Sequence, residues 1–118
     1  MITSIIVDDE EGGRISLNNL LRDNCPNVKV LALAENISSA KNAIEKFKPE
    51  MVFLDIQLRN ENGFDLFKKI DRVDFDIIFV TAYDKYAVKA FKFSALDYIL
   101  KPIDIEELKS AIKKVEKK

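Results

Sequence analysis

The chain has 118 residues, 47% hydrophobic and 33% charged, a balance typical of one globular domain with a core of its own. It has no histidine and a single cysteine, which excludes histidine-based triads, histidine zinc sites and an internal disulfide. The 19 basic and 20 acidic residues nearly cancel, so no overall charge draws the chain to nucleic acid or an anionic membrane. Apolar stretches are too short to cross a bilayer and no apolar leader opens the chain, so we expect a cytoplasmic protein without a membrane partner.

Five short stretches rich in β-branched and aromatic residues predict buried strands of a parallel sheet. In chain order they are residues 5–7, 28–33, 51–54, 77–80 and 98–100. After each strand, apolar residues recur at helical spacing, within residues 15–21, 40–47, 64–70, 87–91 and 105–115. Asn36 and Ser38 are expected to open the second helix, and Asp104 is expected to cap the fifth.

This fivefold alternation of strand and helix predicts a single α/β domain over residues 1–118, built on a doubly wound parallel sheet. The strand order is either flavodoxin-like, 2-1-3-4-5, or a variant of the Rossmann order. In such sheets ligands bind beyond the carboxyl ends of the strands, so the residues that follow each strand are the first to inspect.

Reactive side chains follow four of the predicted strands. They are Asp8, Asp9, Glu10 and Glu11 after the first strand, Asp55 after the third, Thr81 after the fourth and Lys101 after the fifth. Any one of them is also compatible with an ordinary polar loop, and Asp8 with a helix cap. Together, three carboxylates in one cleft repel one another unless a positive charge lies between them. A hard cation with oxygen ligands, Mg²⁺, fits this place, and Lys101 adds a second positive charge.

A carboxylate beside Mg²⁺, a lysine and a threonine hydroxyl suits phosphoryl transfer, in which positioning and charge neutralisation do most of the work. Asp55 is the expected nucleophile and would form an acyl phosphate.

These residues resemble the receiver domain of two-component response regulators over essentially the whole chain. The matching motifs are Val7-Asp8-Asp9-Glu10, Phe53-Leu54-Asp55-Ile56, Gly63, Val80-Thr81-Ala82 and Tyr98-Ile99-Leu100-Lys101-Pro102. Residues 81–91 with Ala95, Asp97 and Tyr98 resemble receivers of the LytR/AlgR kind, which usually precede a LytTR DNA-binding domain. The resemblance implies a flavodoxin-like (βα)5 fold and the N-terminal part of a longer transcription regulator, whose output domain is absent.

The resemblance also implies that Asp55 accepts a phosphoryl group from a sensor histidine kinase. Mg²⁺ would be held by Asp8, Asp9, Asp55 and the backbone carbonyl of Gln57. The domain would promote only its own phosphorylation and dephosphorylation.

Other positions of the resemblance concern the switch. Lys101 would pair with the phosphoryl group, the Thr81 hydroxyl would move to bond it, and Tyr98 would turn inward on activation. The Lys101–Pro102 peptide bond would be cis, as X-proline bonds can be. Phosphorylation is expected to change the face formed by the fourth helix, fifth strand and fifth helix, and to strengthen a homodimer through it.

Contact with DNA is expected only through the absent output domain. The lysines of the last helix are interpreted as a solvated face because glutamates are interleaved with them. They are Lys109, Lys113, Lys114, Lys117 and Lys118.

Two departures from the family pattern stand out. Arg59 occupies a position where many receivers have proline, which predicts a more mobile and more basic loop before Gly63. Gly12 and Gly13 open the first helix, where each glycine weakens a helix interior by about 1 kcal/mol. The sequence offers no function for this pair, and neither departure is expected to affect the residues that carry the chemistry.

The main alternative is a phosphorylation-independent interaction module with the receiver fold. A phosphohydrolase of the haloacid dehalogenase type is disfavoured because Gln57 stands where that family has an acid and the chain leaves no room for a cap. An FMN carrier is disfavoured because four acids follow the first strand and would repel the phosphate.

Four single residues also receive an interpretation. Cys25 is interpreted as a structural thiol and Phe91 as a core residue. Tyr83 is interpreted as a shield of the phosphoryl group, and the ring of Tyr98 is compatible with either an inward or an outward orientation.

Overall fold

The computed structural model describes residues 1–117, so Lys118 and the interpretation given to it lie outside the described residues. Five parallel strands form the central sheet in the order β2-β1-β3-β6-β7. Their bounds are β1 Ile2–Val7, β2 Val28–Ala34, β3 Met51–Leu54, β6 Asp76–Thr81 and β7 Asp97–Leu100. Numbered among themselves, these strands run 2-1-3-4-5, which confirms the flavodoxin-like order and excludes the Rossmann variant.

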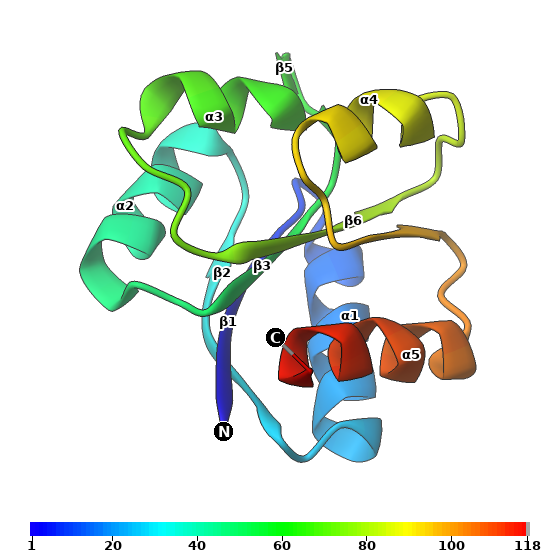
Figure 1. Cartoon of the computed structure of the whole chain (residues 1–118). Helices are drawn as coiled ribbons and strands as arrows, with labels where there is room; N and C mark the ends of the chain where they lie inside the picture. The colour runs from blue at the N-terminus through cyan, green and yellow to red at the C-terminus, as the bar shows by residue number, and fades with distance from the viewer. Residues whose placement is uncertain (118) are drawn as a thin grey trace.

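Helices cover both faces of the sheet, as Figure 1 shows. On one face, α1 (Glu11–Asn24) and α5 (Ile105–Glu116) lie side by side. On the other lie α2 (Ile37–Phe47), the 3-10 turn η1 (Gly63–Asp65) with α3 (Leu66–Lys69), and α4 (Ala87–Lys92). The predicted caps form: the Asn36 side chain accepts a hydrogen bond from Ser39 N at 2.8 Å, and Asp104 accepts one from Glu107 N at 3.1 Å.

The two faces of the sheet account for the continuous apolar strands. Successive side chains of a strand point to opposite faces. Ile5 and Val7 therefore belong to the core that holds the buried residues of α2 and Ala90 of α4, whereas Ile6 belongs to the core that holds those of α1 and α5. Cys25 is buried in the second of these cores, in agreement with a structural thiol. Every strand is thus held by apolar contacts on both sides, which leaves its carboxyl end to carry polar residues.

A short antiparallel hairpin, β4 (Gln57–Leu58) and β5 (Glu61–Asn62), was not predicted. It is built from the segment interpreted as a mobile loop before Gly63. Arg59 and Asn60 form its tip, where Asn60 takes a positive φ of 61°. Two-residue strands are too short to show an alternating apolar pattern, so the sequence carried no signal for them.

The interpretation of Phe91 as a core residue is wrong. Its side chain is 61% exposed, whereas the neighbouring Ala90 is fully buried. Because α4 has only six residues, its narrow buried face is formed by alanine. Phe93, just beyond the helix, stacks on Phe64 and Phe67 instead, with ring centroids 5.1 and 4.9 Å away.

The described lysines of this segment are exposed, which agrees with a solvated face; they are Lys109, Lys113 and Lys114 in α5 and Lys117 directly after it. Within residues 1–117, no helix is both long and apolar enough to span a membrane.

Candidate active site at the carboxyl ends of the strands

The polar residues predicted at the strand ends gather at one edge of the sheet. The backbone places them, because hydrogen bonds of the sheet continue into the loops. Asp55 N donates to Val7 O at 2.9 Å, and Lys101 N donates to Thr81 O at 2.8 Å. Asp8 N donates to Ala34 O at 3.0 Å. The positions of these residues thus follow from the strand register.

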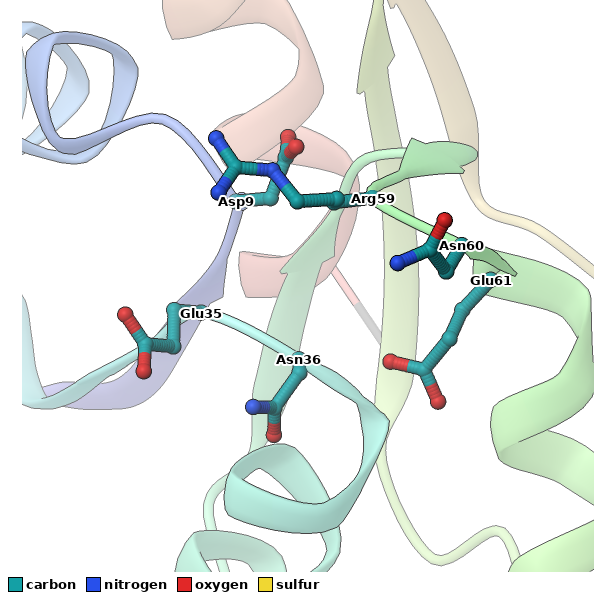
Figure 2. A pocket seen from close by; sticks show the side chains of 6 residues that line it. All are labelled: Asp9, Glu35, Asn36, Arg59, Asn60 and Glu61. Carbon is teal, nitrogen blue, oxygen red and sulfur yellow. The ribbon is translucent and has the colours of Figure 1, made fainter.

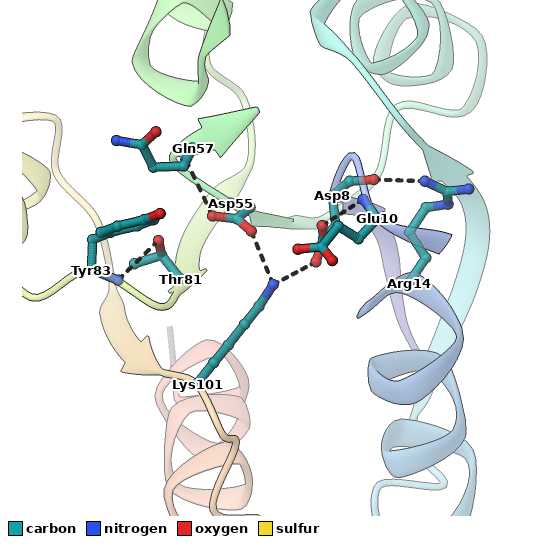
Figure 3. Close-up of polar contacts among 8 residues, drawn as sticks. All are labelled: Asp8, Glu10, Arg14, Asp55, Gln57, Thr81, Tyr83 and Lys101. Atoms are coloured by element: carbon teal, nitrogen blue, oxygen red, sulfur yellow. Dashed lines mark hydrogen bonds and ion pairs between the residues drawn. The ribbon is translucent and has the colours of Figure 1, made fainter. Parts of the chain in front are cut away.

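Lys101 lies between two buried carboxylates, as Figure 3 shows. Its Nζ atom is 2.7 Å from Asp8 Oδ2 and 3.0 Å from Asp55 Oδ2. Asp8 is 4% exposed and Asp55 is 6% exposed, so water screens these ion pairs weakly. Two carboxylates from neighbouring strands therefore share one ammonium group.

Burial and the shared ion pair shift the pKa values of Asp55 and Lys101. Desolvation raises the pKa of Asp55 above its ordinary value of 3.8, and the hydrogen bond from Lys101 offsets part of that rise. Burial also lowers the pKa of Lys101, but the hydrogen bonds and charges of Asp8 and Asp55 outweigh it and leave that pKa above 10.5. Asp55 is therefore a carboxylate whose negative charge is incompletely compensated within the fold.

Asp8 is held at several atoms. Its Oδ1 accepts a hydrogen bond from Glu10 N at 3.0 Å, and its backbone carbonyl accepts one from Arg14 Nη1 at 2.8 Å (Figure 3). The role of Arg14 was not predicted, because nothing in the sequence distinguishes this arginine from one on a solvated helix face.

Carboxylate oxygens of Asp8, Asp9 and Glu10 lie within 4.8 Å of one another. Such all-oxygen groups fit Mg²⁺. Asp55 lies outside this group and is connected to it through Lys101. Glu10 joins the acidic group although it was not among the predicted ligands.

A cleft of about 430 Å³ opens onto these residues. Its lining brings together Asp9, Glu10, Asp55, Gln57, Leu58, Arg59, Ala82, Tyr83 and Lys101. Asp55 Oδ1 accepts a hydrogen bond from Gln57 N at 3.3 Å, which fixes the start of the hairpin beside the cleft.

A second hollow, of about 400 Å³, lies next to this cleft and is drawn in Figure 2. Arg59, at the tip of the hairpin, lines both spaces. The hairpin is attached to the opposite wall by Glu61, whose Oε1 accepts a hydrogen bond from Ile37 N at 3.2 Å.

Thr81 and Tyr98 meet at the loop after β6. Thr81 is fully buried, and its Oγ1 accepts a hydrogen bond from Tyr83 N at 3.4 Å. The half-buried Tyr98 donates from its hydroxyl to the Tyr83 carbonyl, and burial raises the pKa of this phenol. Tyr83 therefore connects the two residues expected to act as the switch. The Lys101–Pro102 peptide bond is cis.

Two glycines approach the acidic residues closely. A Cβ at Gly63 would lie 2.2 Å from the Asp55 carbonyl oxygen. A Cβ at Gly13 would lie 2.3 Å from Asp8 Oδ2, so the expectation that this glycine leaves the site residues unaffected is wrong.

The sequence matches the family described as the response regulator receiver domain over residues 5–113. The chain therefore belongs to this family of signalling modules. Sensory transduction protein LytT of Bacillus subtilis (strain 168) is 42% identical over 119 residues, which cover 99% of this chain and 49% of that protein. LytT of Enterococcus faecalis (strain ATCC 700802 / V583) is 41% identical over 96% of this chain and 47% of its own length. These relatives confirm the resemblance to LytT-type regulators.

Solved structures agree with this assignment. A DNA-binding response regulator of the LuxR family from Staphylococcus aureus has a TM-score of 0.85 at 28% identity and covers 98% of each chain. Response regulator protein TrrA from Thermotoga maritima, in complex with Mg²⁺-BeF, has a TM-score of 0.83 at 28% identity, with 98% of this chain and 99% of that chain covered. The chain spans about half the length of the LytT relatives it matches.

Proposed function

We propose that this receiver domain is a phosphoryl-accepting switch in which Asp55 takes a phosphoryl group from the phosphohistidine of a sensor histidine kinase. The proposal rests on the position of Lys101 Nζ, which lies within 3.0 Å of carboxylate oxygens of both Asp8 and Asp55. A fixed positive charge beside a buried nucleophilic carboxylate is the arrangement that phosphoryl transfer requires.

In this reaction a carboxylate oxygen of Asp55 forms a bond to phosphorus while the phosphorus–nitrogen bond of the donor breaks, and the imidazole nitrogen keeps the electron pair. Asp55 suits the attack because its charge is incompletely compensated in the fold. Lys101 stays close enough to follow the negative charge onto the phosphoryl oxygens.

Asp8, Asp9 and Asp55, with the Gln57 carbonyl, would hold the magnesium ion, and Glu10 is close enough to contribute through water. Bound Mg²⁺ supplies positive charge to the phosphoryl oxygens. The all-oxygen character of the acidic group supports this choice of metal, and the TrrA structure was determined with Mg²⁺-BeF.

The output would be a changed surface. A phosphoryl group adds roughly −1.5 to −2 charge at neutral pH and draws Thr81 and Lys101 toward it. Because Tyr83 N donates to Thr81 and Tyr98 donates to the Tyr83 carbonyl, movement of Thr81 changes the support of the Tyr98 ring. We infer that the change reaches the α4–β7–α5 face, whose exposed apolar residues are Val88, Phe91, Leu100 and Ile105. This face would then pair two copies of the chain, and a DNA-binding domain of the longer protein would read the pairing.

The direct test is intact mass spectrometry after incubation with acetyl phosphate, with and without Mg²⁺. The wild type is expected to gain one phosphoryl group only when Mg²⁺ is present, and Asp55→Ala is expected to gain none. Asp23→Ala, an exposed aspartate on α1, is the matched control and should react like the wild type. No adduct on the wild type, with Mg²⁺ binding established separately, would instead favour a phosphorylation-independent interaction module.

The pairing face has its own test. Sedimentation velocity with acetyl phosphate and Mg²⁺ should show the wild type shifting toward a dimer. Phe91→Asp should stay monomeric although it is phosphorylated, because a charge replaces an exposed aromatic ring of the face. Val73→Asp, a change at an exposed apolar residue outside this face, should dimerise like the wild type.

A further inference from the structure

We propose that Gly13 is a positioning residue for Asp8, because its missing side chain provides the space in which the Asp8 carboxylate pairs with Lys101. The expected effect on Mg²⁺ affinity rests on the proposed function, whereas the argument from packing is independent of it.

The geometry is specific to one carboxyl group. The three atoms nearest to a Cβ built on Gly13 all belong to the Asp8 side chain: Oδ2 at 2.3 Å, Cγ at 3.0 Å and Oδ1 at 3.3 Å. The first distance is far shorter than any contact between a methyl group and an oxygen. The carboxylate thus occupies the place that the side chain of any other residue at position 13 would take.

Asp8 has little freedom to yield. The residue is 4% exposed, its Oδ1 accepts from Glu10 N, and its Oδ2 accepts from Lys101 Nζ at 2.7 Å. The space around it is small, with a residual cavity of about 10 Å³ that is lined by Asp8, Gly13 and Lys101 among other residues. A methyl group at position 13 must therefore rotate the carboxylate away from Lys101 and break the ion pair.

Backbone conformation gives no other reason for the glycine, since neither Gly12 nor Gly13 has a positive φ. Both lie in the first turn of α1, where alanine is the better helix former. A Cβ on Gly12 meets nothing within 4 Å. The adjacent glycine is therefore a matched control that shares the gain in helix propensity and lacks the contact with Asp8.

The test is thermal unfolding without added metal of Gly12→Ala, Gly13→Ala, Asp8→Ala and the Gly13→Ala/Asp8→Ala double variant. Gly12→Ala should raise the Tm by roughly 3 °C. Gly13→Ala should lower the Tm of the wild type but raise that of Asp8→Ala, since the obstructing carboxylate is then gone. If Gly13→Ala does not fold while the double variant does, the proposal is supported. Two outcomes would overturn the proposal. One is an equal change in Tm for Gly12→Ala and Gly13→Ala in the wild-type background, and the other is a decrease in Tm caused by Gly13→Ala that persists in the Asp8→Ala background.

Mg²⁺ affinity, measured by calorimetric titration, gives a readout that general destabilisation does not change. Gly12→Ala should bind like the wild type, and Gly13→Ala about tenfold more weakly, as is typical when a ligand loses its support. Equal affinities for the two glycine variants would contradict the proposal. A wild type that binds no Mg²⁺ would refute the metal site of the proposed function, and the unfolding experiment would still decide the role of Gly13.

Discussion

The side-chain amide of Gln57 donates a hydrogen bond to the Tyr86 hydroxyl across 2.9 Å, and this contact joins β4 to the residue that precedes α4. The two residues are 29 positions apart in the chain. Gln57 lines the cleft beside Asp55, so the bond connects the rim of the candidate site with the N-terminal end of α4, the helix on the proposed pairing face.

Tyr86→Phe tests this contact, because it removes the hydroxyl and keeps the ring beside Phe64, at a centroid distance of 6.1 Å. We expect a double-mutant cycle with Gln57→Ala, measured by urea unfolding, to give a coupling of about 0.5 kcal/mol. The value is small because the bond is exposed. Strictly additive effects of the two substitutions would show that the bond contributes nothing to stability.

Lys101→Met should destabilise the fold by about 1 to 3 kcal/mol without metal, because Asp8 and Asp55 lose the cation that they share. Added Mg²⁺ should stabilise this variant more than it stabilises the wild type. Lys109→Met, at an exposed lysine of α5, is the control and should change unfolding little. The shared ion pair would be unimportant if both variants had the same midpoint in urea.

Asp55→Asn should stabilise the domain at pH 7 by about 1 kcal/mol, since it replaces a buried and incompletely compensated charge with a neutral amide. The pKa of Asp55 is raised in the fold, so the folded state binds this proton more tightly than the unfolded state. The contribution of Asp55 to stability is therefore most favourable below the unfolded value of 3.8 and is lost as the pH rises through the folded pKa. Urea unfolding at pH values from 7 down to 4 should show that the free energies of unfolding of Asp55→Asn and the wild type become more similar. A difference that widens as the pH falls would contradict the predicted direction of the pH dependence.

Tyr83→Ala should shorten the lifetime of the phosphoryl group several-fold. The Tyr83 ring is 45% exposed and lines the cleft, so it is placed to limit the access of water to Asp55. The decay is followed by intact mass after acetyl phosphate is removed. Tyr83→Phe keeps the ring and should decay like the wild type, whereas a longer lifetime for Tyr83→Ala would refute the shielding role.

Gly63→Ala should destabilise the fold by about 2 to 3 kcal/mol, because the new methyl group would lie 2.2 Å from the Asp55 carbonyl oxygen and 3.0 Å from Ile56 Cα. Backbone atoms cannot rotate away as a side chain can. Gly63 N also donates to Ile56 O at 2.6 Å, which holds the two segments together. The thermal unfolding of Gly63→Ala is compared with that of Gly12→Ala, in which the added methyl group meets open space. A similar Tm for the two variants would contradict the close approach of Gly63 to the Asp55 carbonyl oxygen.

The sheet was predictable because its strands are buried on both sides. Met51–Leu54 is apolar at every position, which is the sequence pattern of a strand that is covered on both faces. In the structure β3 has the predicted bounds. Parallel strands also end at one edge of the sheet. For that reason the order of Asp8, Asp55, Thr81 and Lys101 along the chain was enough to predict that they gather.

Features that depend on the third dimension were not predictable. Phe91 has the helical spacing of a core residue, yet α4 is short and its buried face is alanine, so the ring faces solvent. The β4–β5 hairpin is too short to leave a pattern. The contact between Tyr86 and Gln57 depends on how α4 is placed relative to the hairpin, which no local pattern encodes.

The amino-acid sequence by itself determined the class of fold, the strand order implied by its resemblance and the set of acidic, hydroxyl and lysine side chains at the strand ends, because local hydrophobic pattern and chain order carry that information. Only the tertiary structure decided that Lys101 pairs with two carboxylates at once and that the Asp8 carboxylate occupies the space above Gly13. Those contacts join residues from different strands and a helix, so their distances depend on how the layers pack rather than on what is adjacent in the chain.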